Sequence, residues 1–184
     1  MIGRLLLALA VLFLLAFLFS PESFAPLFQP LTKNNAPPIY TQTSLLSLSL
    51  SHLGLVDLAV VASTVGAVGL GILVTRPAGR EFLPLARTVT SVGQTFPPVA
   101  VLALAVPVMG FGAGPTLVAL FLYGLLPIFE NTLTGLTNQP PEVAEAARAM
   151  GMTPRQRLWQ VELPLAMPLI LAGVRLSAVL SLAT

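Results

Sequence analysis

Long apolar stretches alternate with short polar ones along this chain, which predicts membrane-spanning helices rather than the amphipathic helices of a soluble core. Four stretches are expected to span, at residues 2–19, 53–74, 89–108 and 116–136, and a fifth begins at Leu163. A helix rises about 1.5 Å per residue, so about 20 residues cross the hydrocarbon layer of a bilayer.

The polar stretches between these segments are expected to be loops. Residues 20–51 are rich in proline and predict an irregular external loop that ends in a helix along the membrane. Residues 75–88 predict a short basic loop, 109–115 an uncharged turn, and 137–162 a longer polar segment. Basic residues favour the cytoplasmic side, so the arginines of 75–88 and 137–162 predict that both segments, and the N-terminus, are cytoplasmic. Lys33 is the exception.

Composition supports a membrane protein. Hydrophobic residues make up 55% of the chain, charged residues 9%, and the mean hydropathy is +0.90. A soluble domain carries roughly a quarter of its residues charged. The formal net charge of +2 gives no reason to expect a nucleic-acid partner. There is no cysteine and one histidine, His52, so we expect neither a disulfide nor a Cys/His metal site.

The first apolar segment allows a second interpretation. Arg4, the apolar run that follows it and Ser23-Phe24-Ala25 also fit a cleaved signal peptide. The sequence leaves both readings of residues 2–19 open.

Two short helices joined by a tight turn are predicted within residues 138–164, here named the 138–164 loop. Pro140-Pro141-Glu142 suits a helix start, and Gly151 suits the residue after a helix end. Thr153-Pro154-Arg155-Gln156 has the form of a capping box. The second helix is expected to continue to Glu162 and to stop at Pro164.

Such a unit is suited to transmit motion. The alanines of the first helix make it slim enough to enter a groove of a partner, and Glu145 and Arg148 offer charged contacts. Leu163-Pro164 ties the unit to the next span. On local structure alone, an ordinary amphipathic loop helix is an equal alternative.

The spacing of the residues from Glu145 to Pro164 decides between a unit that transmits motion and an ordinary loop helix. Glu145-Ala146-Ala147, three residues, Gly151, nine residues, Val161, one residue and Leu163-Pro164 resemble the EAA motif of bacterial ABC importer permeases, with valine in place of isoleucine. This resemblance implies an all-α membrane protein with about five transmembrane helices and a cytoplasmic helix-turn-helix coupling loop, the MetI-like type I importer fold. It also implies ATPase-coupling residues: Glu145, Ala146, Ala147, Arg148, Gly151, Val161, Leu163 and Pro164.

Other segments narrow the resemblance to the glycine betaine/carnitine/choline (osmoprotectant) permeases. They include Gln94-Thr-Phe-Pro-Pro98, Leu122-Tyr-Gly-Leu-Leu-Pro127 and Ala147-Arg-Ala-Met-Gly-Met152. The resemblance implies a multi-pass protein of the bacterial inner membrane with an N-terminal part (1–51) and a permease domain (52–184). It implies four partners: the lipid bilayer, a second permease subunit in a homodimer or heterodimer, a substrate-binding protein, and an ABC ATPase that binds ATP and Mg. No cofactor is expected in this chain itself.

Two features depart from that family. Glu130 stands where a basic residue is expected, so the local ion pairing is expected to differ. The family also continues with another span beyond the point where this chain stops, at Thr184. We therefore expect a truncated chain with an incomplete pore.

Residues of a translocation path are also predicted. Pro97, Pro98 and Pro127 leave main-chain carbonyls without helical donors, and such carbonyls can line a path. Kinks that only shape packing are the alternative. Arg175 is a candidate because charges inside membranes are often functional, unless the span begins late enough to place it near the cytoplasmic face. Asp57 and Glu130 are expected near the ends of their spans, where snorkelling or capping is favoured.

Other classes of function remain open. An ATPase is excluded because the P-loop pattern G-x-x-x-x-G-K-[ST] is absent and Lys33 is the only lysine. A permease for another small solute such as an amino acid, a secondary transporter or channel, and a membrane scaffold that recruits an ATPase are the alternatives. The chain is not expected to be an enzyme.

Overall fold

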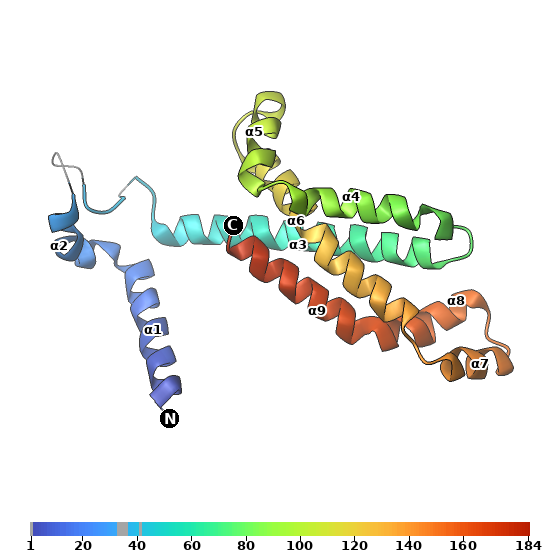
Figure 1. Cartoon of the computed structure of the whole chain (residues 1–184). Coiled ribbons are helices and arrows are strands. Elements are labelled where there is room, and N and C mark those ends of the chain that lie inside the picture. Colours follow the sequence, from blue (N-terminus) through green and yellow to red (C-terminus); the bar gives the residue numbers. More distant parts are fainter. Residues whose placement is uncertain (1, 33–36, 41) are drawn as a thin grey trace. The chain divides into compact units, whose positions relative to one another are not determined.

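The computed structural model describes residues 2–32, 37–40 and 42–184, which divide into two compact units, Met1–Gly54 and Leu55–Thr184 (Figure 1). All regular structure in these described ranges is helical, which confirms the predicted all-α class. Lys33, the exception to the charge pattern, lies outside the described residues.

The first unit is more regular than its prolines predict. After α1 (Ile2–Phe19) come three short helical turns: η1 (Pro21–Phe24), α2 (Ala25–Phe28) and η2 (Gln29–Leu31). The expectation of an irregular loop is wrong here, because each turn has a proline in its first two positions, where a missing N–H costs nothing. The chain bends by 111° after α1, and Phe24 packs edge-on against Phe13 and Phe17 with ring centroids 5.4 Å apart.

Among the described residues, three helices are long and apolar enough to cross a membrane by themselves: α3 (Leu45–Thr75), α6 (Ala113–Thr137) and the continuous helix Pro154–Leu182. Up to five spans result if each of two bent helix pairs counts as one. The predicted number of about five therefore agrees with the structure. The helix α3 begins at Leu45, eight residues before the expected span at 53–74, and includes the serines of residues 45–51.

The expected basic loop 75–88 is shorter than predicted. After α3 the chain turns through η3 (Arg80–Phe82) into α4 (Leu83–Thr95), so its second half is helical. Pro84 lies in the first turn of α4, where a proline is tolerated. A bend of 95° at Phe96-Pro97 then separates α4 from α5 (Pro98–Met109), so the expected span 89–108 is broken rather than straight (Figure 1).

The core of the second unit forms around α6, which packs against α4, α5 and α9 (Leu163–Leu182). Ile128 and Phe129 are fully buried there. Small residues let the helices approach closely: a Cβ on Gly124 would lie 2.6 Å from Ser177 Oγ of α9 and 2.9 Å from Ser63 Oγ of α3.

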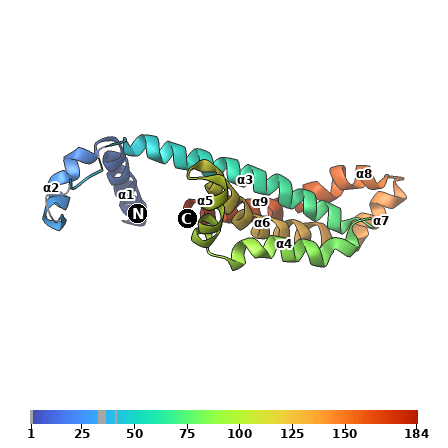
Figure 2. The same cartoon turned by 90° about the horizontal axis from the view of Figure 1, so that it is seen from above.

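The 138–164 loop contains α7 (Pro141–Ala149) and α8 (Pro154–Arg157), followed by a π-helical turn, η4 (Leu158–Glu162), which runs directly into α9. Both views place α7 and α8 at the end of the second unit where α6 ends (Figures 1 and 2). The expectation that the second helix stops at Pro164 is wrong. The wider π turn just before this proline accommodates its missing N–H and its ring, so the helix continues to Leu182.

Candidate functional site

The turn between α7 and α8 is fixed by main-chain hydrogen bonds around Gly151. The Gly151 N–H donates to the carbonyl of Arg148 at 2.9 Å, and the Met152 N–H donates to the carbonyl of Ala147 at 3.1 Å. Together these bonds form a Schellman motif, which needs a left-handed residue at its centre. Gly151 has φ +76° and meets that need without strain.

The start of α8 is held by the predicted capping box. The Gln156 N–H donates to Thr153 Oγ1 at 3.3 Å, and the Thr153 N–H donates to Gln156 Oε1 at 2.9 Å. Pro154 occupies the first turn, where it has no N–H to leave unpaired. The two helices of the 138–164 loop therefore have defined ends on both sides of a short turn.

The residues of the EAA-like motif divide between an outer and an inner face. Glu145, Ala146 and Arg148 are exposed on α7, and the neighbouring Met150 is 72% exposed. Ala147 is only 1% exposed and packs against its own chain. A partner can therefore reach Glu145, Ala146 and Arg148 but not the buried Ala147.

The second half of the motif lies where the loop joins α9. Val161 is half-buried in η4, Leu163 is buried at 7% exposure, and Pro164 is exposed. Leu163 packs with Leu136, Ala166 and Ile170 between the end of α6 and the start of α9. These residues therefore attach the loop to the membrane helices rather than form its outer surface.

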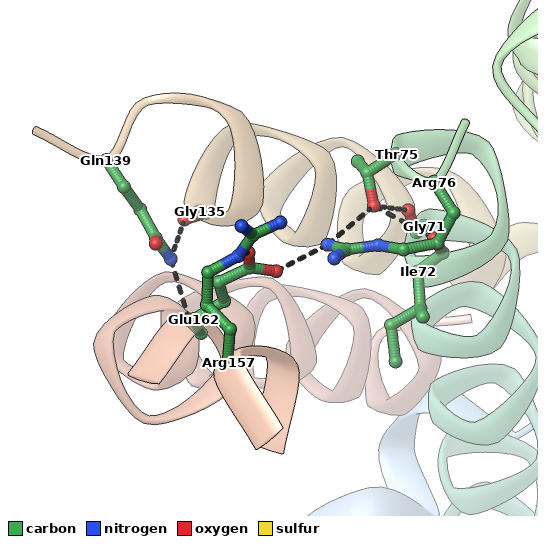
Figure 3. A network of polar contacts seen from close by, with 8 residues as sticks. All are labelled: Gly71, Ile72, Thr75, Arg76, Gly135, Gln139, Arg157 and Glu162. Carbon is green, nitrogen blue, oxygen red and sulfur yellow. Dashed lines mark hydrogen bonds and ion pairs between the residues drawn. The ribbon is translucent and has the colours of Figure 1, made fainter. Parts of the chain in front are cut away.

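Glu162 binds two arginines that come from different parts of the chain (Figure 3). Its Oε1 lies 2.7 Å from Nε of Arg157, and its Oε2 lies 2.6 Å from Nη2 of Arg76, just after α3. The Glu162 and Arg76 side chains are 12% and 24% exposed, so little water screens this ion pair. We name these three residues the Glu162 cluster.

The π turn explains how Arg157 and Glu162 meet. Five residues along an ideal α-helix rotate a side chain by about 140° from the starting face. A π turn closes its hydrogen bonds between residues i and i+5, so the two residues come onto one face. The sequence gives no signal of this turn besides Pro164, and the cluster was not predicted.

Gln139 joins the two ends of the loop. Its Nε2 donates to the carbonyl of Gly135 at 3.1 Å, near the end of α6, and to the carbonyl of Glu162 at 2.7 Å (Figure 3). This contact was also not predicted, because a glutamine in a polar loop gives no sequence signal. It fixes the distance between the chain entering the loop and the chain leaving it.

The three prolines that were predicted to line a translocation path lie in two places. Pro97 is exposed and Pro98 half-buried at the break between α4 and α5, whereas Pro127 is buried inside α6. Gln94 links the two places, since its Nε2 donates to the carbonyl of Tyr123 at 3.4 Å. That carbonyl is four residues before Pro127 and lacks its helical donor for that reason.

Arg175 does not join these prolines. It is exposed on α9 and lines an open hollow of about 580 Å³ with other residues of the same helix, among them Pro168, Ala172 and Val179. It lies about 18 Å from the start of α9 at Leu163. Because the helix runs unbroken from Pro154 to Leu182, the depth of Arg175 in a membrane depends on where along this helix the span begins.

The two acidic residues that were expected near the ends of their spans differ from each other. Glu130 pairs with Arg87 of α4, its Oε1 lying 3.2 Å from Nε, and both side chains are well exposed. Position 130, where a basic residue was expected, is therefore acidic, and its basic partner Arg87 lies on α4 instead. Asp57 is exposed on α3. Within the described ranges no group of three or more His, Asp or Glu residues is placed to hold a metal ion.

Comparison with known proteins identifies the family. Residues 67–184 match the family described as binding-protein-dependent transport system inner membrane component, and this range contains the whole 138–164 loop. The chain belongs to this family. Among relatives of this inner membrane component, the osmoprotectant import permease protein OsmY of Salmonella typhimurium is 44% identical over 78% of this chain and 61% of its own length.

Two further relatives of this transport-system component have similar coverage. The choline transport system permease protein OpuBB of Bacillus subtilis is 37% identical over 73% of this chain and 61% of its own length. The carnitine transport permease protein OpuCB of Listeria monocytogenes is 42% identical over 74% of this chain and 62% of its own length. The chain thus spans about three-fifths of the length of the curated relatives it matches.

Proposed function

We propose that this chain is a transmembrane permease subunit of an ATP-driven importer of glycine betaine or a related quaternary-amine osmoprotectant. The observation that carries the proposal is the 138–164 loop, a rigid two-helix unit with an exposed α7 surface that continues without a break into a membrane helix. A partner that moves this unit moves α9 with it.

The partner proposed for the loop is a soluble ABC ATPase. The sequence has no P-loop, so we assign the binding of ATP and Mg, and the hydrolysis of ATP, to that subunit. Glu145, Ala146, Arg148 and Met150 are the exposed α7 residues proposed to contact it. Gly151 holds the turn, while Ala147, Val161, Leu163 and Pro164 are proposed to position the loop.

The remaining partners follow from the same function. A substrate-binding protein would deliver the osmoprotectant from outside, and a second permease subunit would complete the path in a homodimer or heterodimer. Arg175 supports the second subunit, because an exposed charge on a membrane helix is costly against lipid and calls for protein or water beside it. We propose that its face of α9, with the α4–α5 break at Pro97-Pro98 and the segment of α6 around Pro127, lines the path.

The names of the relatives support the substrate class. Osmoprotectant, choline and carnitine are named for three relatives at 37–44% identity. Uptake of radiolabelled glycine betaine, carnitine and choline by cells that lack their own importers, supplied with the chain, its ATPase and its binding protein, tests this class. Uptake of an amino acid instead of these amines would refute the substrate but not the transporter.

A second test addresses the class of transporter. We expect the chain to co-purify with the ATPase and uptake to require ATP hydrolysis. Uptake that persists with a hydrolysis-deficient ATPase would indicate a secondary transporter or channel. ATPase binding without uptake of any solute would indicate a scaffold.

A further inference from the structure

We propose that the ion pair between Arg76 and Glu162 couples the 138–164 loop mechanically to α3, so that ATP-driven motion reaches this helix as well as α9. This inference rests on the proposed function of the chain as a permease subunit. It assigns a positioning role to two residues outside the EAA-like motif.

The loop is built to move as one body. The Schellman motif around Gly151 fixes α7 against the turn, and the capping box of Thr153 and Gln156 fixes the start of α8. Gln139 closes the loop at its base by binding the carbonyls of Gly135 and Glu162 (Figure 3). A partner that displaces the exposed face of α7 therefore also displaces the base of the loop, because these hydrogen bonds resist deformation between the two.

At this base the chain itself connects the loop to only two helices, α6 before it and α9 after it. The helix α3 ends at Thr75, far away in the sequence. Its Val68 and Ile72 pack against the apolar cluster around Leu163, and its charged contact with the loop is made by Arg76. Thr75 holds that side chain, since its Oγ1 accepts a hydrogen bond from Arg76 Nη2 at 3.3 Å and donates to the carbonyls of Gly71 and Ile72 at 2.9 Å.

Burial makes this ion pair suited to transmit force. An exposed ion pair opens easily because water replaces each partner, whereas opening a mostly buried pair leaves two poorly solvated charges. The Arg87–Glu130 pair shows the difference within the same unit: its side chains are 54% and 40% exposed, against 24% and 12% for Arg76 and Glu162.

Arg157 provides a matched control, because it binds the same carboxylate from the opposite side. Arg157 and Glu162 belong to one continuous helix, so their contact cannot carry motion to α3. Replacing either arginine with glutamine removes one positive charge beside Glu162. Only Arg76→Gln removes the ion pair between the loop and the end of α3 and leaves the apolar packing of Val68 and Ile72 beside Leu163 in place.

The experiment measures substrate transported per ATP hydrolysed, in proteoliposomes that contain the chain with its ATPase and are supplied with the binding protein and labelled glycine betaine. We expect Arg76→Gln to lower this ratio about tenfold and Arg157→Gln to lower it less than about twofold, with ATPase binding retained in both. Equal ratios in the two variants, whether both low or both normal, would overturn the proposal.

A second measurement does not depend on these variants. The sequence has no cysteine, so spin labels can be attached to a chain with Arg80→Cys and Arg155→Cys, two exposed positions on either side of the ion pair. We expect the distance between the labels to stay the same with and without ATP bound to the ATPase. A distance that changes with ATP would refute the link, whereas failure of the unaltered chain to bind any ATPase would refute the proposed function instead.

Discussion

The side-chain amide of Gln94 donates a hydrogen bond to the main-chain carbonyl of Tyr123, with 3.4 Å between Nε2 and O. Pro127 cannot donate to this carbonyl because it has no N–H. The end of α4 thus satisfies a polar group that a proline leaves open inside α6. Inside a membrane there is no bulk water to bind such a group, so this contact stabilises α6 beside Pro127.

We expect Gln94→Leu to destabilise the protein by about 1–3 kcal/mol, because the carbonyl of Tyr123 loses its donor. The thermal unfolding temperature in detergent measures the loss. Thr95→Val is the control, since Thr95 donates only to Ser91 of its own helix. Equal falls in unfolding temperature for the two substitutions would show that the hydrogen bond to Tyr123 does not stabilise the protein.

A second prediction concerns the turn at Gly151. Its φ is +76°, and no atom lies within 4 Å of a Cβ placed there, so Gly151→Ala adds main-chain strain and no clash. That strain is about 1–2 kcal/mol, enough to distort the Schellman motif that sets the angle between α7 and α8. We expect ATPase binding, measured by co-purification or titration, to weaken about fivefold or more.

Gly110→Ala is the matched control for this prediction. Gly110 has φ +79° and equally open surroundings, but it follows α5 and lies outside the 138–164 loop. We expect this substitution to leave ATPase binding unchanged. If Gly110→Ala weakened binding as much as Gly151→Ala, the effect would come from general destabilisation.

Local signals in the sequence were sufficient for the two helix ends on either side of the turn at Gly151, although not for the end of the second helix. The position of Gly151 and the Thr153–Gln156 capping box predicted those ends, because caps depend on residues within one turn of each other. The apolar lengths also predicted α6 to within a few residues. The prolines were harder to interpret, since Pro21, Pro26 and Pro30 begin helical turns in a segment expected to be irregular.

Contacts between distant residues could not be predicted in the same way. Arg76 and Glu162 meet only because a π turn rotates Glu162 and the fold places the end of α3 beside it, and neither event has a local signal. The same holds for Gln94 and Tyr123. The motif spacing thus indicated the coupling loop, while the residues that attach the loop to other helices needed the three-dimensional structure.

A third prediction tests the crossing of α3, α6 and α9 at Gly124. A side chain here would press against Ser177 and Ser63, both fully buried. We expect Gly124→Val to destabilise the protein by about 1–3 kcal/mol through overpacking. Gly69→Val on α3 is the control, because no atom lies within 4 Å of a Cβ there. A similar fall in unfolding temperature for both would contradict the close crossing.

A final prediction concerns charge on the outer face of α7. Glu145 is exposed there and Arg148 lies one turn further on, so the face offers both signs of charge to a partner. Reversing the charge with Glu145→Lys leaves the helix intact but places a cation where the ATPase is expected to present one of its own, and like charges repel. We expect ATPase binding to weaken about tenfold at low salt and less at high salt, because ions screen the repulsion.

Glu81→Lys makes the same change at an exposed position of η3, outside the loop, and should leave binding near its normal value. Equal weakening by both substitutions would mean that total charge governs the interaction, and unchanged binding in both would remove Glu145 from the proposed contact.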